Sequence, residues 1–253
     1  MKKYLGFFSL LAFLVFTTLA SAQDMSNEAK KAYNEGNKHL KAGDYDNAVK
    51  QYQEALKSSK DYRIYYQLGI TLKKQGKMAE AENAFHSAID NNKDFDIGYN
   101  GLGSAYFQNG KYTEAVEAFK KFEQLTKTKS SKEQAKVNIA LAYVKLAEAT
   151  KKDGNYPKAV EYLNNALGYN QTDAAFVLLA TTYYENGDYD KTLTTCDQAL
   201  NMKNFKMKGA AYYYKGMALK QKQILDKAKE NFELAQKDAN YKRLADYELK
   251  LLK

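Results

Sequence analysis

The chain has 253 residues, a formal net charge of +9 at pH 7, one cysteine and no tryptophan. Only Arg63 and Arg243 among its 39 basic residues are arginines, whereas proteins that read nucleic acids use arginine for bidentate contacts. We therefore expect no nucleic-acid partner. A single cysteine excludes an internal disulfide framework, so the fold must rest on packing.

The first 22 residues have the order of a secretory signal peptide. Two lysines precede a largely apolar run over residues 4–19, and the small residues of 20–22 form a cleavage signal. An uncleaved anchor is the alternative, but the run is short for a bilayer span. We expect cleavage before Gln23, a mature chain without a transmembrane segment, and a periplasmic or secreted location.

A phrase with helical spacing recurs along the rest of the chain. Its first copy reads G-D-Y-D-N-A-V-K-Q-Y-Q-E-A-L, and its apolar residues, three and four apart, share one face of a helix. The copies occupy residues 43–56, 76–89, 110–122, 154–167 and 187–200, and a sixth at 225–235 lacks the opening glycine. Repetition at intervals of 33 to 44 residues predicts a repeat architecture, in which each glycine ends the preceding helix.

A second helical phrase lies upstream of four of these copies. It places an aromatic residue first and Gly or Ala four residues later, as in Tyr65 with Gly69 and Phe176 with Ala180. The alternation of the two phrases resembles the tetratricopeptide repeat, whose signature joins an aromatic residue, Leu-Gly and Tyr on one helix to Ala, Phe and Ala on the next. The resemblance implies an all-α, right-handed superhelical solenoid of about six helix pairs.

The resemblance covers nearly the whole chain after the signal peptide. It divides residues 23–240 into units at about 29–61, 62–95, 96–130, 131–172, 173–208 and 209–240. Residues 241–253 resemble a capping helix, with an apolar stripe that contains Tyr241, Leu244, Ala245, Leu249 and Leu252.

The fourth unit is longer than the others. Its first helix can be read in two registers, with either Ala140 or Ala147 as the small contact residue, and both registers point the same face inward. The extra length forms either a long helix pair without a special role or a docking knob.

The shared residues of the units predict how the helices pack. Small residues on the first helices let the two helices of a pair approach closely, and aromatic residues or leucine on the second helices fill the gap between units. Cys196 occupies one of these aromatic positions, so we expect a buried thiol and not a reactive one.

The residues show no constellation for catalysis or metal binding. His39 and His86 have no second His or Cys at ligand spacing, and G-L-G-S at 101–104 lies inside a predicted helix. We expect no enzyme activity, no cofactor, no metal and no small-molecule substrate.

Two functions remain open. The first is a protein–protein interaction scaffold of the bacterial cell envelope, which binds an extended peptide or partner segment in its concave groove. The resemblance implies the scaffold role, and the signal peptide implies the location. The alternative is a structural or assembly subunit of an envelope complex, docking through its edges and ends. The carboxylate clamp of chaperone-tail receptors matches this chain only at Asn37, so we do not expect recognition of a peptide's free C-terminus.

In this family the first helix of each pair lines the concave side. The residues that helical spacing directs there, with two basic residues near the first end of the stripe, are Tyr33, Asn37, Arg63, Tyr66, Ile70, Lys73, Asn100, Phe107, Val137, Leu141, Val177, Tyr184, Tyr213 and Met217. Lys30, Lys41 and Lys74 also fall at or near that end. We therefore expect an aromatic groove with a basic N-terminal half, for a segment with apolar and acidic side chains. The alternative is that these residues pack against neighbouring helices or the chain's own tail.

Overall fold

The computed structural model describes residues 25–252, which form thirteen α-helices and no strand. The predicted signal peptide lies outside the described residues. The helices are α1 (Asn27–Lys41), α2 (Tyr45–Ser58), α3 (Tyr62–Lys74), α4 (Met78–Asn91), α5 (Asp96–Gln108), α6 (Tyr112–Leu125), α7 (Lys129–Lys152), α8 (Tyr156–Tyr169), α9 (Asp173–Glu185), α10 (Tyr189–Leu200), α11 (Lys208–Gln221), α12 (Leu225–Ala235) and α13 (Lys242–Leu251).

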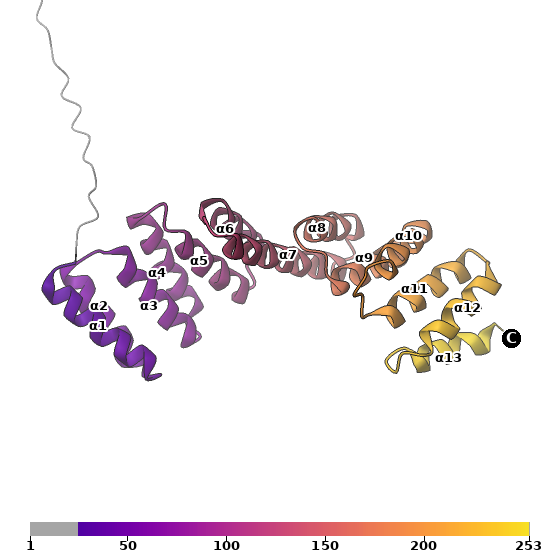
Figure 1. The fold of residues 1–253 in the computed structure, drawn as a ribbon, viewed down its shortest axis with the longest axis horizontal. Coiled ribbons are helices and arrows are strands. Elements are labelled where there is room, and N and C mark those ends of the chain that lie inside the picture. The colour runs from indigo at the N-terminus through magenta and orange to yellow at the C-terminus, as the bar shows by residue number, and fades with distance from the viewer. Residues whose placement is uncertain (1–24, 253) are drawn as a thin grey trace, which may run out of the picture.

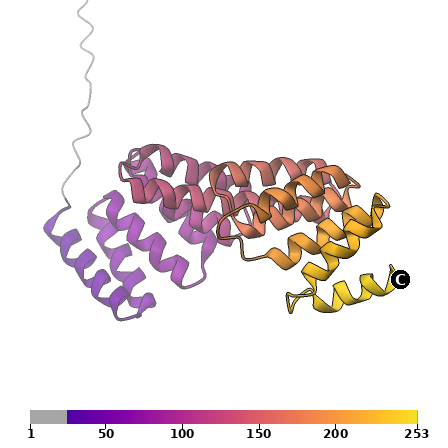
Figure 2. The same ribbon diagram turned by 45° about the vertical axis from the view of Figure 1, so that its right-hand side comes forward.

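Consecutive helices pair and stack into an elongated, curved array, as Figure 1 shows. Six pairs run from α1–α2 to α11–α12, and α13 packs on the last pair. Figure 2 shows α1 and α13 at opposite ends of the array, with the long α7 between them. The predicted all-α solenoid is confirmed.

The turn inside each pair depends on a left-handed residue. Gly43, Gly76, Gly110, Gly154 and Gly187 occupy this position with φ between 76° and 81°. The last pair has lost its glycine, and Gln223 takes the same conformation with φ of 59°. The hydrogen bond from Ile224 N to Leu219 O, 3.0 Å, closes the turn as the equivalent bonds do in the other pairs.

Replacing Gln223 with glycine is expected to stabilise the protein. A side chain in the left-handed region costs about 1 kcal/mol, and part of that gain is offset by the extra freedom of glycine in the unfolded chain. Urea unfolding should show a free energy of unfolding higher by up to about 1 kcal/mol. Gln221→Gly, at the end of α11, is the control and should destabilise; equal effects of the two changes would contradict the argument.

Aromatic side chains of the second helices pack on glycines of the first. A Cβ atom on Gly36 would lie 2.7 Å from the Tyr52 ring, and one on Gly69 would lie 2.8 Å from the Phe85 ring. The glycines are therefore required by close helix approach. Each aromatic ring lies first against its own pair, and Phe85 reaches the next pair as well, because Gly101 leaves room for it.

The long helix α7 serves two pairs at once. Ala140 is buried in a cluster with Phe119 of α6, whereas Ala147 is buried in a cluster with Ala159 and Leu163 of α8. Both registers read from the sequence are thus used, by successive halves of one 24-residue helix.

Cys196 is fully buried among the side chains of α9, α10 and α11, as predicted. Burial raises the pKa of its thiol to about 12, so the reactive thiolate is scarce at neutral pH. We expect labelling by a thiol reagent to be on the order of a hundredfold slower in the native protein than in denaturant, because it requires local opening. Equal rates would contradict the buried position.

The last helix buries a narrower stripe than the sequence predicts. Ala245 is fully buried, and Tyr241, Leu249 and Leu252 pack on the same cluster. The prediction is wrong for Leu244, since its side chain is 43% exposed. Leu244 lies on the outer flank of α13, because the helix rotates its Ala245–Glu248 edge toward the array.

Candidate functional site

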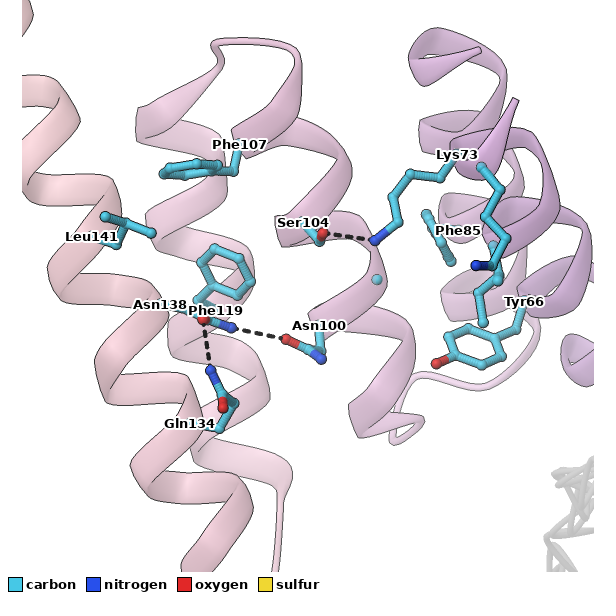
Figure 3. Close-up of a pocket in the computed structure, with 13 residues that line it drawn as sticks. Tyr66, Lys73, Phe85, Asn100, Ser104, Phe107, Phe119, Gln134, Asn138 and Leu141 are labelled. Atoms are coloured by element: carbon cyan, nitrogen blue, oxygen red, sulfur yellow. Dashed lines mark hydrogen bonds between the residues drawn. The ribbon is translucent and has the colours of Figure 1, made fainter. Parts of the chain in front are cut away.

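A cavity of about 440 Å³ opens on one side of the array, where the first helices of three successive pairs lie next to one another. Figure 3 shows α3, α5 and α7 forming its walls. Two second-helix rings, Phe85 and Phe119, contribute to its floor. The other lining residues are Tyr66, Ile70, Lys73, Lys74, Asn100, Gly101, Ser104, Phe107, Gln134, Asn138 and Leu141.

Small residues on α5 leave room for the two aromatic rings that form the floor of the cavity. A Cβ atom on Gly101 would lie 2.6 Å from the Phe85 ring, and one on Gly103 would lie 2.7 Å from the Phe119 ring. Side chains at these two positions would push α5 away from both rings. The G-L-G-S stretch is therefore a helical packing motif whose last residue, Ser104, reaches the cavity.

One end of the cavity carries positive charge. The Lys73 Nζ atom donates a hydrogen bond to Ser104 Oγ at 2.8 Å. Burial, and secondarily the neighbouring Lys74 ammonium, lowers the pKa of Lys73. No carboxylate is among the lining residues, and Lys73 makes no ion pair within the described part of the chain. Lys73 is thus a half-buried ammonium whose observed partner is a neutral hydroxyl.

A string of amides crosses the cavity from α7 to α5. Gln134 Nε2 donates to Asn138 Oδ1 at 3.0 Å, and Asn138 Nδ2 donates to Asn100 Oδ1 at 3.3 Å. Figure 3 shows Asn138 at the bend of this string, with Gln134 on one side of it and Asn100 on the other. Because each acceptor oxygen is already engaged, the string orients Asn100 with its Nδ2 donor pointing away from α7.

The other end of the cavity is apolar. Phe107 of α5 and Leu141 of α7 face it, and Leu141 remains 47% exposed. Tyr66 stands on the α3 side, with its ring centroid 5.8 Å from that of Phe85 and 5.1 Å from that of Phe95. Burial, with a smaller effect of the Asp96 carboxylate, raises the pKa of Tyr66, so its hydroxyl stays protonated at neutral pH.

The structure brings six of the fourteen predicted site residues together in this cavity: Tyr66, Ile70, Lys73, Asn100, Phe107 and Leu141. The other eight line no part of it. Among them, Val137 lies one turn before Leu141 on α7 and is 42% exposed.

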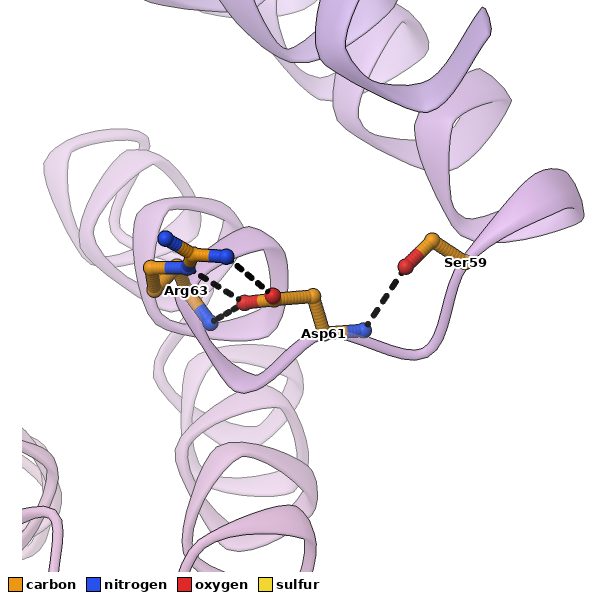
Figure 4. Close-up of polar contacts among 3 residues, drawn as sticks. All are labelled: Ser59, Asp61 and Arg63. Atoms are coloured by element: carbon orange, nitrogen blue, oxygen red, sulfur yellow. Dashed lines mark hydrogen bonds and ion pairs between the residues drawn. The ribbon is translucent and has the colours of Figure 1, made fainter. Parts of the chain in front are cut away.

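The predicted residues before Tyr66 are engaged elsewhere. Tyr33 packs with its ring centroid 6.0 Å from that of Tyr52, and Asn37 accepts a 2.8 Å hydrogen bond from the Tyr52 hydroxyl. Arg63 pairs with Asp61 at the start of α3 through bonds of 2.6 Å and 2.8 Å (Figure 4). The backbone N–H of Asp61 in turn donates to Ser59 Oγ. The Arg63 charge is therefore neutralised outside the cavity.

The predicted residues after Leu141 pack among their neighbours. Val177 lies against the cluster around Cys196, and Met217 lies against the cluster around Phe232. The Tyr213 ring centroid lies 5.9 Å from that of Phe232 and 5.5 Å from that of Tyr241, and Tyr184 packs on Tyr214. Tyr184 and Tyr213 thus continue the row of aromatic residues along the first helices. All four side chains are partly buried against neighbouring helices.

The sequence did not identify several residues that shape the site. Ser104 could have been identified, because it stands in the G-L-G-S stretch that the sequence analysis noted. Gln134 and Asn138 could also have been identified: they are four residues apart on the long first helix of the fourth unit, so they share a face. Lys74, in contrast, was predicted at the basic end of the groove, and it lines the cavity with its Nζ atom 6.0 Å from the centroid of the Tyr45 ring.

Residues 25–252 show neither a membrane-spanning helix nor a metal-binding cluster. No helix in this range has the length and apolar character that a membrane span needs. No group of three or more His, Cys, Asp or Glu side chains in the same part is arranged to hold a metal ion.

Comparison with known proteins agrees with this architecture. A tetratricopeptide repeat model matches residues 66–128 and 144–206, and a second TPR repeat model matches residues 36–76. A curated relative, the BBSome complex member BBS4 of Bos taurus, is 29% identical over 154 residues, which are 60% of this chain and 28% of the relative. The chain thus spans less than a third of that protein.

Two solved structures are similar in fold. The C-terminal part of a TPR repeat-containing protein from Cytophaga hutchinsonii aligns with a TM-score of 0.56 and 16% identity, over 83% of this chain and 82% of that one. YrrB, described as a TPR protein with an unusual peptide-binding site, aligns with a TM-score of 0.50 and 18% identity, over 79% and 97%.

Proteins built on these repeats are typically non-enzymatic interaction scaffolds that bind protein or peptide partners. The two repeat models together cover more than half of the sequence. Four of the six helix pairs pack an aromatic ring of the second helix on a glycine of the first, as the repeat signature requires, and Leu163 and Cys196 take the place of the ring in the other two. The chain therefore belongs to the tetratricopeptide repeat family.

Proposed function

We propose that this protein is a non-enzymatic scaffold of the bacterial cell envelope that binds an extended segment of a partner protein. The observation that carries the proposal is the cavity between α3, α5 and α7, which combines hydrogen-bond donors with an apolar wall. Small-ligand and peptide sites commonly have this composition, in which a few polar groups fix orientation and apolar groups supply contact area.

Peptide selection combined with hydrogen–deuterium exchange tests the proposal. Phage-displayed 12-residue peptides would be panned on residues 23–253, and exchange would be measured with the best synthetic peptide. Protection is expected in α3, α5 and the first half of α7. Failure to enrich any peptide, or protection confined to other helices, would overturn the proposed site.

The envelope location rests on the N-terminal sequence. An apolar run after two lysines, followed by small residues, supports export with cleavage before Gln23. N-terminal sequencing of protein from the periplasm of an expressing bacterium should return Gln23 as the first residue. A chain that retains Met1 and stays in the cytoplasm would contradict export.

The alternative function is an assembly subunit that docks through its end. One observation favours it: Leu244, Tyr247 and Leu251 on α13 are 43%, 61% and 56% exposed and share one flank of the helix. An apolar flank is unusual on the helix that closes a solenoid, where a polar outer face is required for solubility. The cow relative is itself a member of a complex. Protection of α13 in the exchange experiment would favour this function.

A further inference from the structure

The polar end of the cavity presents donors. Lys73 carries three N–H groups, of which one is directed to Ser104 Oγ. Because that oxygen accepts from Lys73, the Ser104 hydroxyl hydrogen is free to be donated elsewhere. Two neighbouring groups on α3 and α5 can thus donate to one anion at the same time.

Asn100 adds a third donor. Its Oδ1 accepts from Asn138, and the Nδ2 group has no hydrogen-bond partner among the described residues. Figure 3 shows this nitrogen on the side of the Asn100 amide that faces away from Asn138. The bond from Gln134 to Asn138 fixes the orientation of the string, so that this donor is held in place.

The charges around these donors are positive. Lys73 and Lys74 both line the cavity, and none of its lining residues is acidic. Asp96, which is outside the lining, lies near enough to Tyr66 for its carboxylate to contribute to the raised pKa of that residue. A half-buried ammonium without a carboxylate partner is unfavourable, and binding a carboxylate removes part of that cost.

We propose that the cavity recognises an aspartate or glutamate side chain within an extended partner segment, held by Lys73, Ser104 and Asn100. A neighbouring apolar side chain of the same segment lies against Phe107 and Leu141. The inference rests on the proposed function, since it assigns side-chain chemistry to the peptide that the cavity binds. We assign the carboxylate to a side chain because the apolar wall lies beside the donors. A segment that crosses both must carry an apolar residue next to its acidic one.

Panning with matched variants tests this inference. The library would be selected on the wild-type chain, on Lys73→Met, and on the control Lys77→Met, which removes the charge of an exposed lysine that does not line the cavity. Wild type and Lys77→Met should enrich peptides that pair an acidic with an apolar residue. Lys73→Met should keep the apolar preference and lose the acidic one. Peptides without acidic enrichment, or with equal enrichment on Lys73→Met, would overturn the inference and leave the proposed function standing.

The selected peptide allows a quantitative check. Changing its acidic residue to the amide should weaken binding to wild type by roughly tenfold or more, because charge-assisted hydrogen bonds are lost. The same change should have little effect on binding to Lys73→Met, whereas Lys73→Arg should retain most of the discrimination. Amidating the peptide's C-terminus should have no effect. A collapse of affinity on amidation would assign the donors to a terminal carboxylate and refute the side-chain assignment.

Discussion

Replacing Phe85 with alanine is expected to lower the free energy of unfolding by about 3–5 kcal/mol, the usual cost of removing a buried aromatic ring. The Phe85 side chain is fully buried. Its ring lies against Gly69 of its own pair and Gly101 of the next, and Tyr66 packs on it. In a solenoid each unit is stabilised by its neighbours, so a void at this junction weakens two pairs together.

Urea unfolding followed by circular dichroism measures the effect. Tyr247→Ala is the matched control, because it truncates an aromatic side chain that is 61% exposed, and it should change stability by less than about 0.5 kcal/mol. Similar losses in the two variants would show that Phe85 does not fill the junction described above. A second, separate unfolding transition in Phe85→Ala would indicate that the N-terminal pairs have become uncoupled from the rest.

The fold could be predicted because its determinants are local and repeated. A glycine in five of the six turns, a small residue on each first helix and an aromatic residue on four of the six second helices recur along the chain, with Leu163 and Cys196 at the other two second-helix positions. Each has a distinct physical role in the structure, since Gly43 adopts a positive φ and Gly36 makes room for Tyr52. Where the sequence lost a determinant, as at Gln223, the neighbouring contacts still impose the same turn.

The candidate site was only partly predictable. Helical spacing identifies which residues face the concave side, but it does not show where neighbouring helices enclose a cavity. Helical spacing treated all first helices as equivalent, which holds for Tyr66, Asn100 and Leu141 but not for the tyrosines that pack into the C-terminal clusters. The cavity forms where α7 is long enough to bring Gln134 and Asn138 beside α5. That placement depends on how three helices meet, which no single repeat encodes.

The sequence also overestimated the positive charge of the predicted groove. Arg63 counts toward a basic groove only if its charge is unpaired, and Asp61, two residues earlier, accepts two of its guanidinium hydrogen bonds. This pairing is short in sequence and could have been anticipated. The Lys73–Ser104 contact spans 31 residues, so it needed the structure. The basic character of the cavity therefore rests on the two adjacent lysines of α3.

Leu141→Lys is expected to weaken binding of the selected peptide by at least about tenfold while leaving the melting temperature nearly unchanged. The side chain is 47% exposed, so the substitution costs little in the free protein. In the complex, the ammonium would meet the apolar face of Phe107 and the apolar side chain of the ligand, and its desolvation would oppose binding. Fluorescence anisotropy with a labelled peptide measures the change.

Val137→Lys separates the cavity from the general stripe of exposed apolar residues on α7. Val137 is 42% exposed and lies one turn before Leu141, but it does not line the cavity. Both variants add the same charge to the same helix, so long-range attraction to an acidic peptide increases equally in both. Loss of binding confined to Leu141→Lys would therefore report direct contact. If Val137→Lys binds as weakly as Leu141→Lys, the ligand follows the stripe along the helix, and the boundaries of the site lie outside the cavity.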